Sequence, residues 1–154
     1  MNAALRQATG VAISGRALLI EGPPGSGKSS LALALIDRGA VLIGDDGVAL
    51  RSRDGALWAG PPPNIRGLLE IRNVGLVAFP VTEAPIGLIV RIDPDAPRLP
   101  AETARITLLG HAIPALALHP AGAILPLRAE RALELHGLAT LPPFHLAGES
   151  PDRG

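Results

Sequence analysis

The residues with the clearest chemistry form a glycine-rich segment, GPPGSGKS, at residues 22–29. It fits the pattern G-x-x-x-x-G-K-[ST], and it stands between an aliphatic run and an expected helix, where that pattern is most informative. Glycines let backbone N–H groups turn toward phosphate oxygens, and the start of a helix adds positive partial charge. The lysine would contact the β- and γ-phosphates, and the serine hydroxyl would contact Mg²⁺. The segment predicts a nucleotide-binding loop made of Gly22, Pro23, Pro24, Gly25, Ser26, Gly27, Lys28, Ser29 and Ser30.

Two adjacent carboxylates, Asp45 and Asp46, directly follow the aliphatic run at residues 40–44. In doubly wound sheets ligands sit outside the carboxyl ends of the strands, so the pair should lie near the glycine-rich loop. Carboxylates there could hold Mg²⁺ or accept a proton from an attacking hydroxyl. The stretch DDG between two strand-like runs also suits a hairpin turn, and such a turn can carry a site.

A second charged pair, Glu70 and Arg72, lies in the stretch LLEIRNVG. In a strand the two side chains would share a face, and the residues alone favour a surface ion pair. An ordinary Walker B strand, four apolar residues ending in Asp and followed by Glu, is missing from the sequence. The nearest candidate, IGLIVRIDPD, is interrupted by arginine and proline, which weighs against a motor or transporter ATPase.

The elements that must position these residues begin with a strand at residues 16–22, a helix at 28–39 and a strand at 40–44. This is a βαβ unit, which favours a parallel pair of strands. One domain is expected at residues 1–140, with a flexible tail at 141–154. Further expected elements are a hairpin about Asp54-Gly55, strands at both ends of 68–80, a strand at 86–92, an irregular proline-rich stretch at 93–103, a hairpin about Gly110 and a helix at 125–137.

Composition narrows the class of protein. The 154 residues hold 14 basic and 14 acidic side chains without a basic run, which argues against nucleic-acid binding. The absence of cysteine excludes disulfides and thiolate metal sites. Apolar runs are too short for a membrane span, and the start MNAALRQATG lacks the apolar core of a signal peptide. We therefore expect a soluble, cytoplasmic protein.

The order of the GKS loop, LALALIDRGAVLIGDD, PPPNIRGLLEIRNVG, DAPRLP and IPALAL resembles the catalytic domain of bacterial HPr kinase/phosphorylase, most of all its short alphaproteobacterial form. The resemblance spans residues 7–137, and residues 69–75, LEIRNVG, are similar to the family signature. It implies an α/β P-loop kinase fold with a mixed central sheet, related to phosphoenolpyruvate carboxykinase. Full-length relatives are hexameric, which implies self-association.

The same resemblance implies an activity and its cofactors, ATP and Mg²⁺. The activity is phosphorylation of a serine on HPr or an HPr-like phosphocarrier protein. It includes a reverse reaction in which phosphate attacks phosphoserine and gives pyrophosphate. By resemblance, the catalytic residues are Asp45, Asp46, Arg72 and Arg98, and those near the metal are Ser29, Asp45 and Glu70.

Three positions depart from the family pattern. Gln7 stands where the family has a histidine that faces the phosphates, Ser30 replaces an acid after GKS, and Asn73 replaces a signature glycine. Gln7 and Ser30 favour one alternative, a nucleotide-binding sensor or partner module with weakened catalysis. The acidic residues and Arg98 oppose it. Another alternative is a small-molecule or nucleotide P-loop kinase. The sequence lacks the arginine-rich lid that is usual in such kinases, which argues against it.

Overall fold

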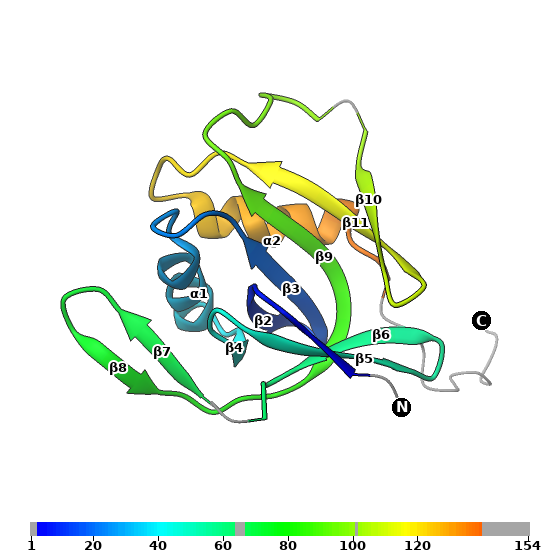
Figure 1. Cartoon of the computed structure of the whole chain (residues 1–154). Helices are drawn as coiled ribbons and strands as arrows, with labels where there is room; N and C mark the ends of the chain where they lie inside the picture. The colour runs from blue at the N-terminus through cyan, green and yellow to red at the C-terminus, as the bar shows by residue number, and fades with distance from the viewer. Residues whose placement is uncertain (1–2, 64–66, 101, 140–154) are drawn as a thin grey trace.

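The computed structural model describes residues 3–63, 67–100 and 102–139 (Figure 1). Within these residues a curled mixed sheet has the strand order β1-β5-β6-β9-β3-β2-β4, with β11 and β10 branching from β9, and β7 and β8 form a separate pair. The bounds are β1 Ala3–Arg6, β2 Thr9–Ile13, β3 Arg16–Glu21, α1 Lys28–Asp37, β4 Val41–Gly44, β5 Val48–Arg53, β6 Ala56–Gly60, β7 Leu68–Ile71, β8 Gly75–Ala78, β9 Ala84–Ile92, β10 Ala104–Leu108, β11 His111–Leu118 and α2 Leu125–His136.

The long strand β9 connects the parts of the sheet, and it bends along its length (Figure 1). Its first two residues pair antiparallel with β6, and later residues pair parallel with β3 and with β11. Leu88 and Val90 belong to one hydrophobic core and Ile89 to another. The continuous aliphatic run of β9 follows from this burial on both faces.

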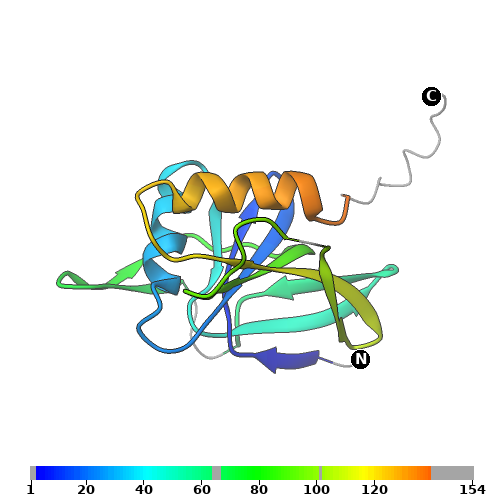
Figure 2. The same cartoon turned by 90° about the horizontal axis from the view of Figure 1, so that it is seen from above.

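The two cores lie on opposite faces of the sheet. Both helices cover one face, while β1, β5 and β6 fold over the other (Figure 2). Alternation along β3 fits this arrangement, because Leu18 and Ile20 enter the core beneath the helices and Ala17 and Leu19 enter the core enclosed by the curl. The expected mixed α/β sheet is confirmed.

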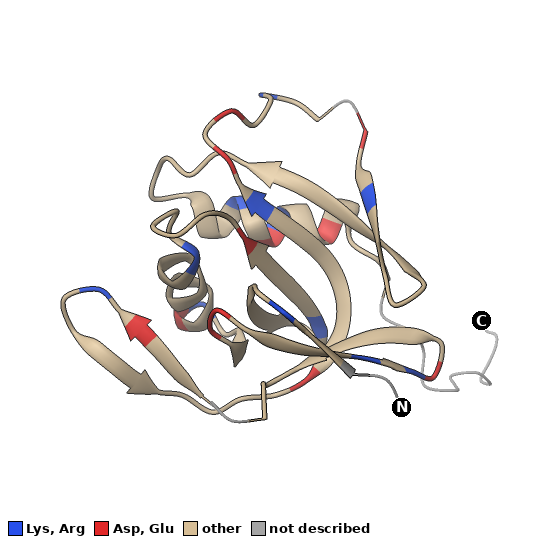
Figure 3. Ribbon diagram, viewed as in Figure 1, with Lys and Arg blue, Asp and Glu red and all other residues tan. Residues whose placement is uncertain are grey.

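Side chains also join the helices to their surroundings. Arg38 at the end of α1 donates from Nε to Oε2 of Glu130 in α2 at 2.8 Å, and this hydrogen bond raises the pKa of Arg38. Arg16 at the start of β3 donates to the carbonyl oxygen of Leu133 in the last turn of α2 and to that of Leu138, just beyond the helix. Acidic and basic residues are interspersed over the described ribbon, without a continuous basic stripe (Figure 3).

The expected parallel pair within the βαβ unit is wrong, because β2 lies between β3 and β4 and pairs antiparallel with both. The stretch TGVAI of β2 was missed since glycine and alanine give a weak strand signal. The hairpin interpretation of Asp45-Asp46-Gly47 is also wrong. After this turn β5 pairs with β1 and β6, so β4 and β5 are not neighbours.

Other expected elements are confirmed. The turns of the β5–β6 and β10–β11 hairpins each have positive φ at two central residues, at Asp54-Gly55 and at Leu109-Gly110. Strands β7 and β8 and the helix α2 also lie where the sequence predicts them. The described part of the chain contains no helix long and apolar enough to cross a membrane. The tail expected at residues 141–154 lies outside the described residues, so the domain division stays a prediction.

Candidate active site

Four segments that are separate in sequence form a cleft of about 850 Å³. They are the junction of β1 and β2, the glycine-rich loop with the start of α1, the turn after β4, and the β7–β8 hairpin, which projects from the body of the molecule (Figure 1). Most of the residues predicted from sequence line this cleft: Gly22, Pro24, Gly25, Gly27, Lys28, Ser29, Ser30, Asp45, Asp46, Glu70 and Arg72.

The glycine-rich loop needs glycine at its first and last turns. A Cβ on Gly22 would lie 2.6 Å from Oγ of Ser26 and 3.3 Å from the carbonyl oxygen of Ile92, so a side chain would displace the Ser26 hydroxyl and crowd the end of β9. Gly27 has φ 101°, in the left-handed region, and directly precedes α1. Ser26 donates its backbone N–H to the carbonyl of Pro23, and its buried hydroxyl has no hydrogen-bond partner among the residues that the structure describes.

The start of α1 is suited to an anion. Its N-cap position, Gly27, offers no side-chain hydrogen bond, and the first turn holds no acidic residue. The first backbone N–H groups of a helix have no partner inside the helix, and they carry positive partial charge. Lys28 donates from Nζ to the carbonyl oxygens of Gly22 and Pro23, at 2.9 and 3.3 Å. An ammonium has three protons, so one remains for a phosphate oxygen.

Asp45 is the centre of the hydrogen bonding in the cleft. Its Oδ1 accepts from Oγ of Ser29 at 2.7 Å and from Oγ1 of Thr9 at 3.1 Å. Its Oδ2 accepts from the backbone N–H of Glu70 at 3.1 Å. One half-buried carboxylate therefore joins the first turn of α1, the strand β2 and the strand β7. Sequence reasoning missed Thr9, because a threonine that opens an apolar run carries no signal of its own.

Asp46 differs from Asp45 in its exposure and in its hydrogen bonding. Its side chain is exposed, lines the cleft, and has no hydrogen-bond partner among the described residues. Its backbone is held in the left-handed region at φ 60°, with its N–H donating to Oγ1 of Thr9 at 3.1 Å. The cleft thus contains one engaged carboxylate and one open carboxylate side by side.

The hairpin corrects the expectation that Glu70 and Arg72 share a strand face and form an ion pair. Arg72 lies in the turn after β7, so it does not share a strand face with Glu70, and the described residues contain no ion pair between them. Both residues nevertheless line the cleft. Asn73, in place of a glycine, has φ 70°, a conformation that asparagine tolerates better than most residues.

Two other residues differ in their placement. Gln7 lines the cleft, as its expected position facing the phosphates requires. Arg98 is exposed in the segment between β9 and β10, and it is not among the residues that line the cleft.

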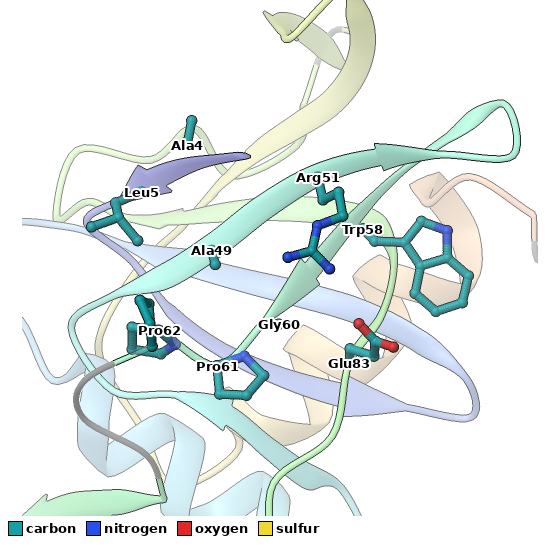
Figure 4. Close-up of a pocket in the computed structure, with 10 residues that line it drawn as sticks. Ala4, Leu5, Ala49, Arg51, Trp58, Gly60, Pro61, Pro62 and Glu83 are labelled. Carbon is teal, nitrogen blue, oxygen red and sulfur yellow. The ribbon is translucent and has the colours of Figure 1, made fainter. Parts of the chain in front are cut away.

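A second cavity, of about 620 Å³, lies against β1, β5 and β6 (Figure 4). Its polar side chains, Arg51, Trp58 and Glu83, border an apolar floor of proline and alanine. Trp58 is only half-buried, and the guanidinium of Arg53 lies 3.7 Å from the centroid of its ring. Because none of the predicted site residues reaches this cavity, the first cleft is the candidate active site.

The donor set of the cleft fits a magnesium ion only together with phosphates. The described residues contain no group of three or more His, Cys, Asp or Glu that could hold a metal. Mg²⁺ is usually bound by one or two carboxylates plus waters and substrate phosphates. Ser29 donates its proton to Asp45, which leaves its oxygen lone pairs for a cation.

The cleft therefore combines groups suited to a phosphate and to a divalent cation, on a mixed α/β fold. The family model described as HPr Serine kinase C-terminal domain matches residues 3–82, which include every residue that lines the cleft. The chain belongs to this family, as the sequence resemblance implied.

Relatives and a solved structure agree with this assignment. HPr kinase/phosphorylase of Clostridium botulinum (strain Eklund 17B / Type B) is 46% identical over 67 residues, which are 44% of this chain and 22% of that protein. The enzyme of the same name from Streptococcus thermophilus (strain CNRZ 1066) is 46% identical over 68 residues, with the same shares. The matched segment thus spans about a fifth of the curated relatives' length.

The structural likeness extends beyond the matched sequence. The structure of the Hpr(Ser) kinase/phosphatase from Coxiella burnetii superposes with a TM-score of 0.77 at 28% identity, over 86% of this chain and 90% of that one. Coverage this wide extends past residue 82, where the family match ends.

Proposed function

We propose that the chain is the catalytic domain of an ATP- and Mg²⁺-dependent protein-serine kinase that acts on HPr or an HPr-like phosphocarrier. Family membership and the names of the relatives support this activity. The observation that carries the mechanism is the contrast between the engaged carboxylate of Asp45 and the open carboxylate of Asp46.

The phosphates of ATP would lie on the free N–H groups at the start of α1, with Lys28 beside them. Ser29 and Asp45 would hold Mg²⁺. When bound, this ion would neutralise negative charge on the phosphates. Glu70 also lines the cleft and would place a further carboxylate near the ion. Arg72, in the adjacent turn, would face the transferred phosphoryl group.

Asp46 is the better candidate for the acid/base. Each oxygen of Asp45 already accepts hydrogen bonds, whereas the carboxylate of Asp46 is exposed in the cleft. In the forward reaction Asp46 takes the proton of the substrate serine as that oxygen attacks the γ-phosphorus and the bond to ADP breaks. In reverse, a phosphate oxygen attacks the phosphoserine phosphorus, pyrophosphate forms, and protonated Asp46 returns the proton to the departing serine oxygen.

The direct test is incubation of the protein with ATP, Mg²⁺ and the HPr-like protein of the same organism, followed by mass analysis of the phosphocarrier. The expected result is a single phosphorylation on serine. Nucleotide binding without transfer would refute the kinase proposal and support a sensor module. Phosphorylation of a small molecule instead of the protein would support the small-molecule kinase. Cytoplasmic location and self-association are parts of the proposal that fractionation and sedimentation would test.

A further inference from the structure

We propose that Thr9 is a positioning residue for the carboxylate pair, holding Asp45 and Asp46 in register with the glycine-rich loop. The inference rests on the proposed function. It concerns a residue that binds neither substrate nor cofactor and acts through the two aspartates.

The burial of Thr9 is the first observation. Its relative exposure is 0%, and it is the one fully buried polar or charged residue in the described part of the chain. Buried hydroxyls in proteins are usually hydrogen-bonded, because burying a hydroxyl without a partner costs free energy. Both partners of Thr9 belong to the candidate site.

The direction of the two hydrogen bonds is the second observation. Oγ1 of Thr9 donates its proton to Oδ1 of Asp45 and accepts the backbone N–H of Asp46, each at 3.1 Å. Only a hydroxyl among side chains of this size can do both at one atom. The bond to the Asp46 N–H also holds Asp46 in the left-handed region, a conformation that is uncommon for residues other than glycine.

The position of Thr9 in the sheet explains why it can align the site. It opens β2, where its backbone pairs with Ile20, close to the end of the strand that leads into the glycine-rich loop. The next residue, Gly10, pairs with Gly44, at the end of the strand that leads to the aspartates. The register of β2 against β4 shifts between Gly10 and Val11, and such irregularities commonly re-aim side chains beside active sites. Thr9 therefore couples the acidic turn to the phosphate-binding strand.

The test compares Thr9→Val, which keeps the shape and removes the hydroxyl, with Thr9→Ser, which keeps the hydroxyl. Val11→Ala is the matched control, since Val11 is also fully buried in β2 but contacts neither aspartate through a hydrogen bond. The readouts are kcat and KM for ATP, and the hydrogen exchange of the Asp46 amide in the nucleotide-free protein.

We expect Thr9→Val to lower kcat by about 10–100-fold with KM for ATP near that of the parent, because small misplacements of reacting groups cost about this much. Its Asp46 amide should exchange faster, and Thr9→Ser should restore both properties. Val11→Ala should lower Tm without this loss of kcat. Should Thr9→Val fail to fold, Thr9→Cys replaces it with the same expectations, because a thiol is a weak donor and acceptor.

Parent-like kcat in Thr9→Val, or an equal loss in Val11→Ala, would overturn the inference. An inactive parent would instead refute the proposed function. In that case the hydrogen exchange of the Asp46 amide alone tests the inference. An exchange rate in Thr9→Val equal to that of the parent would show that the Thr9 hydroxyl does not hold the two aspartates.

Discussion

The hydroxyl of Ser29 donates to Oδ1 of Asp45 at 2.7 Å, so the first turn of α1 is bonded directly to the end of β4. This contact divides the roles of two adjacent carboxylates. Asp45 joins three segments by hydrogen bonds and, as we propose, binds Mg²⁺. The carboxylate of Asp46 is exposed and accessible to a substrate. The division yields different expected phenotypes for residues that are next to each other in sequence.

Asn substitution should separate the two aspartates. Asp46→Asn should slow phosphoryl transfer by about 10²–10⁴-fold while ATP still binds, because it removes the acid/base. Asp45→Asn should raise the Mg²⁺ concentration needed for half-maximal rate. Steady-state kinetics across a magnesium series would measure both effects. Asp54→Asn is a matched control, since Asp54 also has positive φ but lies in the β5–β6 turn. Equal rates in Asp46→Asn and Asp54→Asn would remove Asp46 from the chemistry.

Lys28→Ala should nearly abolish productive use of ATP, since it removes the cation expected on the β- and γ-phosphates. The thermal midpoint should change little, because the Lys28 ammonium contacts only loop carbonyls. ATP turnover and calorimetric melting would measure the two properties. Lys28 is the only lysine of the chain, so amine-directed labelling in the presence and absence of ATP gives an independent check. ATP turnover at the parent rate would contradict the assignment of the loop.

Arg98→Ala should reduce transfer to the phosphocarrier without affecting folding. Arg98 is not among the residues that line the cleft, so its expected contribution requires the segment after β9 to move toward the cleft when the partner binds. There the charge of Arg98 would stabilise the phosphoryl group during transfer. Arg105→Ala, an exposed arginine on β10, is the control. Transfer rates with the phosphocarrier, together with circular dichroism, distinguish the variants. If both variants transfer phosphate equally well, Arg98 is not part of the site.

The reaction should also run in reverse. Purified phosphoserine carrier, excess phosphate and Mg²⁺, without nucleotide, should give pyrophosphate, because the protonated acid/base can return its proton to serine. A coupled pyrophosphate assay measures the product, and Asp46→Asn is the negative control. Kinase activity without pyrophosphate would refute the reverse half of the proposal. Gln7→His would then show whether an ionisable group at that position restores it.

The sequence alone predicts most of the short local elements that line the cleft. The loop at residues 22–29, the acidic pair and the hairpin at residues 68–78 follow from short patterns, in which glycine positions and aliphatic runs determine backbone shape. These patterns act over a few residues, so distant neighbours do not change them. Family resemblance added what the chemistry of single residues leaves open, such as the choice between a surface ion pair and a site for Glu70.

The parts that depend on distant partners were not predictable. Strand β2 was missed because its identity comes from pairing with β3 and β4 and not from its own residues. The role of Thr9 was missed for the same reason, since its hydroxyl meets Asp45 only after β2 pairs with β4. Arg72 was placed in a strand because alternation alone cannot show that β7 ends at Ile71.

The place of β9 in the sheet also has a consequence for the order of folding. Strand β3, which leads into the glycine-rich loop, has its parallel neighbour in β9, and the partners Leu19 and Ile89 are far apart in sequence. Contacts at such separation form slowly because a long chain segment must first be closed into a loop. During synthesis one edge of β3 would therefore stay unpaired until β9 has left the ribosome. The segment at residues 3–82 that carries the family match contains the complete cleft but ends before β9, so it lacks the strand that pairs with one edge of β3.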